Sequence, residues 1–377
     1  MSSFEVKIYK LEIIPHPNAD KIDLAKVGDY VSIVKKGDFK TGDLGVYIPE
    51  ASLVPQTILE DMGLVGKLSG SAKNKVKAIR LRGVLSQGLV YKPEHPDWRR
   101  TLLPYWKEDT EVANLLGITK WEPVIPQHLR GKTASKRIGE DLNITIKYDI
   151  ENVKKYNTVF QDGELVQITE KIHGTNIQLG CVARRLSKPH LYLGMYTVSS
   201  KGLGGQGVLL DFEDQSNVYA GTAKDNRYGF GYKLPCIRAE YQELIGDEPI
   251  YACGEVFGPG IQRGYSYGVG ATDTEFRLFD IAFGERANLR YMDAELVEKI
   301  CKDYEIPMVP VLYKGPFSKE ILLKHTDGKE TVSGKSLHIR EGAVVKPLQE
   351  RIDSRAGRVI LKSVSAEYLL KDNTEYQ

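Results

Sequence analysis

Short runs of alternating apolar and polar residues, broken by turn residues, fill the chain from about residue 4 to residue 92. Residues 30–34 end at Lys35-Lys36-Gly37-Asp38, residues 44–48 end at Pro49, and residues 76–81 alternate up to Gly83. Closely spaced short strands of this kind are typical of a small β-barrel rather than of helices. We therefore expect a barrel domain over residues 1–125, with a linker or irregular wrap from Pro93 to about Arg130.

The pattern changes after residue 131, where longer strands mix with a few helices. The alternating Leu142, Ile144 and Ile146 begin this part, and strand-like apolar runs occupy residues 165–168, 250–253, 276–281 and 342–345. Residues 293–301 have an acidic start and apolar side chains at helical spacing, which predicts a helix. We expect a second domain over residues 131–377 and an α+β fold overall.

Composition excludes several classes of protein. The 52 basic and 50 acidic side chains leave a net charge of +2, so a nucleic-acid surface requires local clustering of charge. No apolar stretch approaches the roughly 18 residues of a membrane span, and the first residues contain no apolar signal core. The four cysteines form no C-x-x-C pair, which argues against a zinc site or a disulfide framework. These features predict a protein that has no membrane segment. They also predict that it is located in the cytoplasm or in another reducing intracellular compartment.

One segment has a strong local charge asymmetry. Between Gly66 and Lys92 there are seven basic residues and no acidic ones: Lys67, Lys73, Lys75, Lys77, Arg80, Arg82 and Lys92. Lys75 and Lys77, together with Lys73, share strand parity, which predicts that they line one face. A solvated basic surface without a ligand explains this segment equally well.

The most informative string is Thr169-Glu170-Lys171-Ile172-His173-Gly174-Thr175-Asn176, which follows the apolar run 165–168. Lys171 is therefore expected at the end of a strand, before a turn that Gly174 permits, and can project into a cleft. A single K-x-x-G is weak evidence, because most such lysines are solvated at a strand edge.

The wider string resembles motif I of the covalent nucleotidyltransferases, the superfamily of DNA ligases, RNA ligases and mRNA-capping enzymes. It is similar to the RNA-ligase form, in which His173 stands where DNA ligases usually have Asp. Five further strings resemble motifs Ia, III, IIIa, IV and V of the superfamily, so the resemblance covers roughly residues 150–370. They are, in chain order, Ser199-Ser200-Lys201-Gly202, Cys253-Gly254-Glu255-Val256-Phe257-Gly258, Arg277-Leu278-Phe279-Asp280, Arg340-Glu341-Gly342-Ala343-Val344-Val345-Lys346-Pro347 and Val359-Ile360-Leu361-Lys362-Ser363.

The resemblance implies a chemistry that suits these residue types. Lys171 becomes covalently adenylylated by ATP, which needs a neutral amine although a free lysine has a pKa of about 10.4. Glu255 and Glu341 would hold a hydrated Mg²⁺ or Mn²⁺. The remaining implied ligands of ATP or AMP contact its base, ribose or phosphates or order the site: Glu170, His173, Asn176, Lys201, Phe279, Asp280, Lys346 and Lys362.

Each residue alone has a simpler interpretation. Phe279 is also what a strand core requires, the two glutamates could be solvated turn residues, and His173 could be structural. These interpretations do not explain why the residues follow motif order. Two departures from the family pattern remain. Motif V often has two lysines, but here only Lys362 is present, with Arg358 and Lys346 as candidates for the missing charge, and Lys201 replaces the usual arginine of motif Ia without its bidentate fork.

Residues 15–20, Pro15-His16-Pro17-Asn18-Ala19-Asp20, begin a run that resembles the tRNA-binding-type OB domain. An OB barrel before the nucleotidyltransferase (ATP-grasp-like ligase) domain, with none after it, is similar to the type-five RNA ligases. These seal 3′-OH/5′-phosphate nicks in duplexes whose 3′-OH end is RNA. The resemblance thus implies an N-terminal OB barrel followed by antiparallel sheets with flanking helices. It also implies RNA as partner and a role in RNA repair. The charge asymmetry makes Lys73, Lys75, Lys77, Arg80 and Arg82 the candidate RNA contacts, and we expect a monomer.

Two alternatives remain open at this point. A DNA ligase or a capping guanylyltransferase would use the same covalent chemistry, but His173 and the position of the OB domain argue against both. An RNA-binding protein on an inactive transferase scaffold is the alternative outside enzymes, and complete motifs I, III and IV argue against it.

Overall fold

The computed structural model of the chain describes residues 4–121, 145–185, 192–201, 207–210, 217–262 and 264–371. These residues form two compact units. The barrel unit contains residues 4–121, Asn152–Asn157 and residues 366–371, and the sheet unit contains residues 145–151 and Thr158–Ser365. Residues 152–157 and 366–371 lie in the second range expected from the sequence, yet they group with the barrel. Leu142 and Ile144 lie outside the described residues.

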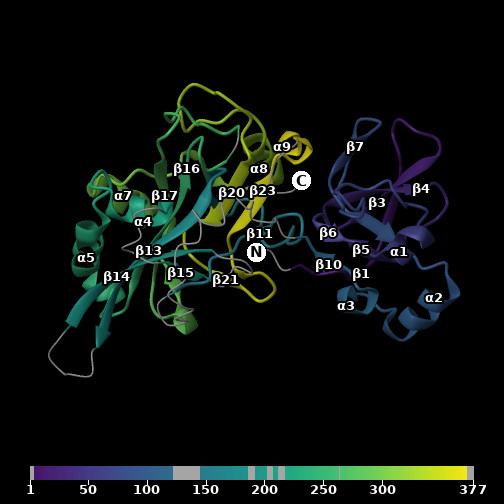
Figure 1. Ribbon diagram of the computed structural model, residues 1–377, viewed down its shortest axis with the longest axis horizontal. Coiled ribbons are helices and arrows are strands. Elements are labelled where there is room, and N and C mark those ends of the chain that lie inside the picture. The colour runs from purple at the N-terminus through teal and green to yellow at the C-terminus, as the bar shows by residue number, and fades with distance from the viewer. Residues whose placement is uncertain are drawn as a thin grey trace. The chain divides into compact units, whose positions relative to one another are not determined.

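The barrel unit consists of short antiparallel strands (Figure 1). Its two three-stranded sheets have the orders β1-β5-β9 and β2-β3-β4, and two further pairs are β7-β8 and β6-β10. The strands are β1 (Lys7–Lys10), β2 (Glu12–Pro15), β3 (Ile22–Val27), β4 (Tyr30–Lys35), β5 (Leu44–Ile48), β6 (Ser52–Leu53), β7 (Ile79–Leu81), β8 (Val84–Ser86), β9 (Leu89–Tyr91) and β10 (Thr119–Lys120). The prediction of a small barrel of short strands is therefore confirmed.

Two predictions for this unit were too simple. The alternating run 76–81 is a strand only from Ile79, because residues 76–78 join no ladder and Lys75 before them makes only isolated bridges to Leu53 and Ser69. The stretch after Pro93 is helical in several places, since Pro96 starts a helix that the His95 side chain caps. The helices are α1 (Gln56–Asp61), α2 (Pro96–Leu102), η1 (Leu103–Tyr105), α3 (Ala113–Leu116) and, from the end of the chain, α9 (Ala366–Leu370).

The sheet unit contains two main sheets, in which β12 is antiparallel to β19 and β20, β20 to β23, and neighbouring strands from β15 to β18 to one another (Figure 1). The six-stranded sheet has the order β15 (Val208–Leu210), β14 (Tyr192–Ser200), β13 (Thr175–Arg185), β16 (Ile250–Phe257), β17 (Glu275–Phe283) and β18 (Arg290–Tyr291). The five-stranded sheet has the order β11 (Glu151–Asn152), β23 (Leu361–Val364), β20 (Gly342–Pro347), β12 (Leu165–Lys171) and β19 (Val311–Pro316). A small hairpin joins β21 (Ile352–Asp353) and β22 (Gly357–Arg358).

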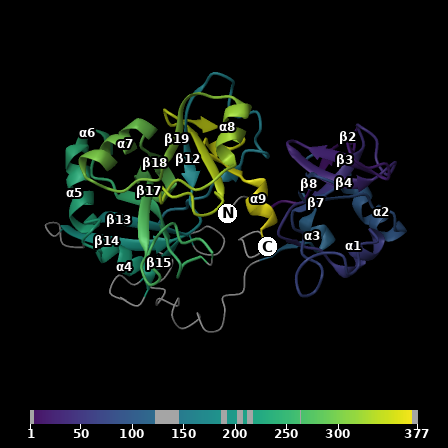
Figure 2. The ribbon, with the colours of Figure 1, turned by 90° about the horizontal axis from the view of Figure 1, so that it is seen from above.

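Helices cover the outer face of each main sheet. The helix expected at 293–301 is present as α7 (Ala294–Asp303), and its buried positions Val297 and Ile300 pack in the core against β17. The other helices of the six-stranded sheet are α4 (Val218–Lys224), α5 (Phe230–Glu240) and α6 (Gln242–Ile245), with η3 (Arg286–Asn288) before β18. Helix α8 (Lys319–Thr326) packs on β12, β20 and β23 (Figure 2).

A second core lies between the two sheets and brings their inner faces together. Tyr251 and Cys253 of β16 pack there with Val344 of β20 and Ile360. This core is small, because several inward positions of both sheets are polar, and these polar positions form the site described below. Within the described parts of the chain, every helix is too short or too polar to traverse a lipid bilayer.

Candidate active site

Lys171 is the last residue of β12, as expected, and it meets the start of β20. Its backbone pairs with Gly342, and its Nζ lies 2.5 Å from Oε1 of Glu341. The Glu341 side chain is fully buried, whereas the Lys171 side chain keeps 20% of its surface exposed. The second oxygen of Glu341, Oε2, lies 3.7 Å from Nδ1 of His173. The structure thus combines three residues of motifs I and IV around one buried carboxylate.

Gly174 sets the path of the chain after the lysine. A Cβ atom at this position would lie 2.3 Å from the Val256 carbonyl oxygen and 2.8 Å from Cγ of Glu255. Only glycine fits such a close approach, so the K-x-x-G turn packs directly on β16 beside Glu255. The turn is also fixed by the His173 backbone N–H, which donates to Oη of Tyr267 at 2.7 Å. Glu255 is therefore brought next to the motif I turn.

Strand register places the three expected phosphate-binding lysines of motifs I, IV and V on one face. Lys171 lies opposite Gly342, and Lys362 lies opposite Val344. Lys346 is two residues beyond Val344 on the same strand. Because directly opposed residues and alternate residues share a face, Lys171, Lys346 and Lys362 all belong to the face that packs against the six-stranded sheet. The same rule puts Asn176, Glu255 and Asp280 on the facing side of that sheet.

Asp280 connects the two sheets and is fully buried. It accepts hydrogen bonds from Lys346 Nζ at 3.1 Å, from Arg358 Nη2 at 2.7 Å and from Tyr148 Oη at 2.7 Å. Burial alone would raise the pKa of this carboxyl, but the cations of Arg358 and Lys346 hold it below its usual value. Arg358 also pairs with Glu350 at 2.6 Å, so two carboxylates neutralise it. Asp280 is thus an ordering residue of the site.

Phe279 owes its position to a β-bulge. Cys253 pairs with Asp280 and Gly254 pairs with Leu278, which leaves Phe279 as the extra residue on β17. The bulge turns Phe279 toward the core between the sheets, where its ring centroid lies 5.1 Å from that of Tyr148. Bulges of this kind often re-aim a side chain next to an active site.

The other expected nucleotide ligands lie near this inner face. Asn176 Oδ1 accepts from Gln178 Nε2 at 2.7 Å, and Lys201 Nζ pairs with Asp149 Oδ1 at 2.9 Å. Lys362 is half-buried on β23. Arg358 and Lys346, the two candidates for the missing motif V charge, both form an ion pair with Asp280.

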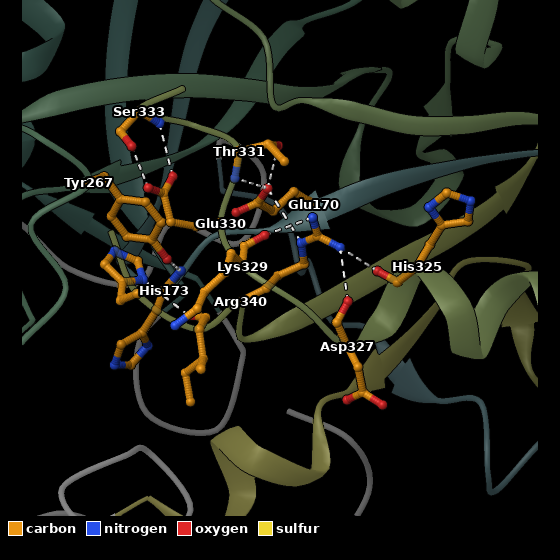
Figure 3. Close-up of polar contacts among 12 residues, drawn as sticks. Glu170, His173, Tyr267, His325, Asp327, Lys329, Glu330, Thr331, Ser333 and Arg340 are labelled. Atoms are coloured by element: carbon orange, nitrogen blue, oxygen red, sulfur yellow. Dashed lines mark hydrogen bonds and ion pairs between the residues drawn. The ribbon is translucent and has the colours of Figure 1, made fainter. Parts of the chain in front are cut away.

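Glu170 differs from the other expected ligands, because it precedes Lys171 and faces the opposite side of the sheet. Its Oε2 accepts from Thr331 N at 2.8 Å and from Thr331 Oγ1 at 2.6 Å, and Arg340 Nε lies 3.5 Å away (Figure 3). Burial raises the pKa of this carboxyl, against the opposing effect of these donors. The Glu170 carboxylate is therefore engaged behind the site and away from the Lys171 cluster. Sequence reasoning missed the roles of Thr331 and Arg340, although Arg340 stands inside the motif IV string.

The five expected RNA-binding residues differ in exposure. Lys75 is buried with 3% of its surface exposed, and its Nζ lies 3.2 Å from the centroid of the Trp121 ring. The expectation that Lys75 lines a surface with Lys73 and Lys77 is wrong, because residues 73–77 form no regular strand and Lys73 sits at a positive φ of 52°. Burial lowers the pKa of Lys75 to about 8. Arg80 and Arg82 are exposed on the β7–β8 hairpin.

The carboxylates of the site fit a hydrated divalent cation better than a closed metal cage. Among the described residues, no three His, Cys, Asp or Glu side chains gather as a group that could ligate a metal. Glu255 and Glu341 come from different sheets, both next to the Lys171 turn. A cation that keeps several water molecules is bound by one or two carboxylates in this way, as is usual for Mg²⁺.

Known proteins match this chain in sequence and in fold. A family model described as RNA ligase matches residues 164–364, and a model of an OB-fold domain matches residues 5–93. Solved structures of a Naegleria gruberi RNA ligase resemble the whole chain. An apo form has a TM-score of 0.75 at 23% identity, with 100% of both chains covered. A form with ATP and Mn has a TM-score of 0.73 at 22% identity, with 99% of both chains covered. A form with AMP and Mn has a TM-score of 0.73 at 22% identity, with 100% of both chains covered.

Proposed function

The chain belongs to the RNA ligase family, and on that premise we propose that it seals RNA strands with ATP through a lysyl-AMP intermediate on Lys171. The observation that carries this proposal is the pair between Lys171 and the buried Glu341, with His173 beside it, at the junction of β12 and β20. A lysine held at a strand end against one carboxylate can point its amine at a bound phosphate and transfer its proton nearby.

In the first step Nζ of Lys171 attacks the α-phosphorus of ATP. A nitrogen–phosphorus bond forms, the bond to the bridging oxygen breaks, and pyrophosphate leaves. The amine must lose its proton, and the Glu341 carboxylate 2.5 Å away is placed to accept it. Lys346 and Lys362, on the same face as Lys171, then stabilise the negative charge on the phosphate oxygens. In this step the Lys346 ammonium group leaves the Asp280 carboxylate and binds the phosphate, because the carboxylate and the phosphate compete for the same group.

We propose that Glu255 and Glu341 would hold the divalent cation. The resemblance to the metal-dependent ligases and the Mn-bound forms of the Naegleria gruberi enzyme support this proposal. When bound, Mg²⁺ or Mn²⁺ supplies positive charge to the phosphates of ATP. Phe279 offers a face for the adenine ring, with Asn176 and His173 near the ribose and phosphates. Lys201 lies at the edge of the same inner face. Glu170 supports the site from behind.

In the later steps AMP moves from Lys171 to an RNA 5′-phosphate, and the 3′-OH attacks that phosphate and releases AMP. We propose nicked duplexes with an RNA 3′-OH end as substrate and RNA repair as the role, with a monomer as the active species. The order of an OB barrel before the transferase domain supports this, as it is similar to the type-five RNA ligases. The division of labour is then binding of RNA by the barrel unit and chemistry in the sheet unit.

The β7–β8 hairpin is the part of the barrel unit best suited to RNA. Arg80 and Arg82 are exposed there, and no acidic residue occurs between Gly66 and Lys92. The hairpin turn is held by the motif around residue 16, since Asn18 Nδ2 donates to the Arg82 carbonyl at 3.0 Å. Removal of one arginine should lower the slope of log affinity against log salt by about 0.9 on a duplex, if each contacts one phosphate. An unchanged slope for both Arg80→Ala and Arg82→Ala would place RNA elsewhere.

The decisive test of the chemistry is incubation of the full chain with α-labelled ATP or GTP. We expect a covalent label from ATP that Lys171→Ala abolishes. The same variant should still seal a nick that already carries AMP on its 5′-phosphate, because that step needs no lysine nucleophile. Labelling of Lys171→Ala by ATP would show that another residue is the nucleophile. Labelling of the wild type by GTP alone would favour a capping enzyme.

A further inference from the structure

A buried arginine organises the loop between α8 and β20, directly behind the active site. Arg340 Nη1 donates to the carbonyl of His325 at 2.7 Å, and Nη2 donates to the carbonyl of Lys329 at 2.9 Å (Figure 3). Its own backbone N–H donates to the Gly328 carbonyl at 2.8 Å. Only 7% of the residue is exposed. Arg340 therefore fixes the whole turn 325–329 through its planar fork of donors.

The same guanidinium also reaches β12. Its Nε lies 3.5 Å from Oε2 of Glu170, which Thr331 holds with two hydrogen bonds. Glu170 is 2% exposed, so the attraction between the two charges is weakly screened. The ion pair joins the end of β12 to the second residue before β20.

This pair is the immediate neighbour of the pair that contains the nucleophile. Glu170 precedes Lys171, and Arg340 precedes Glu341, so consecutive residues of two segments form consecutive ion pairs. Within β12, Glu170 and Lys171 point to opposite faces of the sheet. Arg340 and Glu341 precede β20 and each contacts one of these two residues, so the Arg340–Glu170 pair lies behind the sheet and the Lys171–Glu341 pair lies in front of it. The backbone between the two pairs is short and hydrogen-bonded, with Lys171 opposite Gly342. Movement of the rear pair would therefore displace the front pair.

We propose that Arg340 and Glu170 are positioning residues: their ion pair sets the distance between Lys171 and Glu341 and the direction of the attacking amine. This rests on the proposed function, since it assigns a task within adenylylation. Displacement of a reacting group by about 1 Å can lower a rate by about 100-fold. The rear pair is held by four groups besides itself: the carbonyls of His325 and Lys329 and the two donors of Thr331. It is thus rigid enough for this task.

The test measures single-turnover formation of Lys171-AMP by the full chain at saturating ATP. The amplitude reports the folded, active fraction, and the rate constant reports the positioning of the amine. We expect Arg340→Met and Glu170→Gln each to lower the rate constant by about 100-fold and to shift its pH profile. The ATP concentration at half-maximal rate should change by less than about threefold, because neither group faces the nucleotide. Arg340→Lys should recover part of the rate, and the double variant should be no slower than the slower single variant.

Arg351→Met is the matched control. Arg351 donates two hydrogen bonds to Glu164, at 2.7 Å and 2.9 Å. Glu164 directly precedes β12, at the end of the strand far from Lys171. Its loss should lower the melting temperature while the rate constant and its pH profile stay as in the wild type. Rate constants within about threefold of the wild type for both Arg340→Met and Glu170→Gln, with unchanged pH profiles, would overturn the proposal. An equal fall for Arg351→Met would overturn it too, because any weakened strand would then have the same effect. Absence of Lys171-AMP in the wild type would instead refute the proposed function.

Discussion

Asp280→Asn tests whether one buried carboxylate holds the two sheets together. The change keeps the shape of the side chain but removes the charge that faces Lys346 and Arg358, at 3.1 Å and 2.7 Å. Removal of one partner from a buried ion pair leaves an uncompensated charge and typically costs about 3–5 kcal/mol. Arg358 keeps Glu350, whereas no second carboxylate partner is seen for Lys346 among the described residues, so we expect a loss near the middle of that range. This is a large part of the roughly 5–15 kcal/mol that stabilises a typical domain.

The assay is urea unfolding of the full chain at several pH values, with Glu350→Gln as the control. In the control Arg358 retains Asp280, and the glutamine oxygen can still accept one of the two hydrogen bonds that Arg358 donates to Glu350, at 2.8 Å and 2.6 Å. The stability of the control should therefore fall by about 1 kcal/mol, the typical contribution of one hydrogen bond. The pKa of Asp280 is lowered in the fold, so its stabilisation is present above the unfolded pKa and is lost as the pH falls through the folded pKa. The difference between the wild type and Asp280→Asn should therefore shrink in acid. A difference below about 1 kcal/mol at neutral pH, or one that grows in acid, would refute the electrostatic role.

Two further predictions concern carboxylates in other settings. Glu255→Ala and Glu341→Ala should each lower the rate of Lys171-AMP formation by orders of magnitude at saturating Mg²⁺, because charge stabilisation at the phosphorus is lost. Near-normal rates for both would remove them from the site. Burial raises the pKa of Glu50 in the barrel unit to about 7, against a hydrogen bond from Gln87 and the charge of Lys154. Because the folded pKa of this acid is raised, the stability of the wild type falls as the pH rises from the unfolded pKa of about 4.5 toward 7. Glu50→Gln should remove this decline, which is on the order of 2 kcal/mol, and unfolding at pH 5 and pH 8 would measure it.

Much of the architecture could be predicted because strands leave a local pattern. The apolar runs at 165–168 and 342–345 predicted β12 and β20. Lys171 ends the first strand and Glu341 precedes the second, and the two side chains contact each other. The motif order supplied what the pattern alone could not, namely that these two ends are neighbours. Local reasoning failed where burial is decided by distant residues. Lys75 follows the alternation of its neighbours, but Trp121, 46 positions later, covers it.

The contacts that order the site join residues too far apart for any local pattern to reveal. Tyr148 and Asp280 are 132 positions apart, and Glu170 and Thr331 are 161 positions apart. Helix α2 was missed for a different reason, since its start at Pro96 depends on a cap from His95 that composition alone does not indicate.

The two-residue alternation of β12 helps to explain why the motif strings did not reveal the Arg340–Glu170 ion pair behind the site. Glu170 and Lys171 point to opposite faces of β12, and Arg340 and Glu341, which precede β20, each contact one of them. Each motif string therefore contains one residue of the chemistry and one residue of its support. Sequence resemblance assigned Glu170 to the nucleotide and gave Arg340 no role, because it does not distinguish the two faces. The contacts separate them: the lysine and its glutamate face His173, and the glutamate and its arginine face Thr331. A charged residue next to a catalytic motif residue should therefore be tested as support for the site before it is assigned as a ligand.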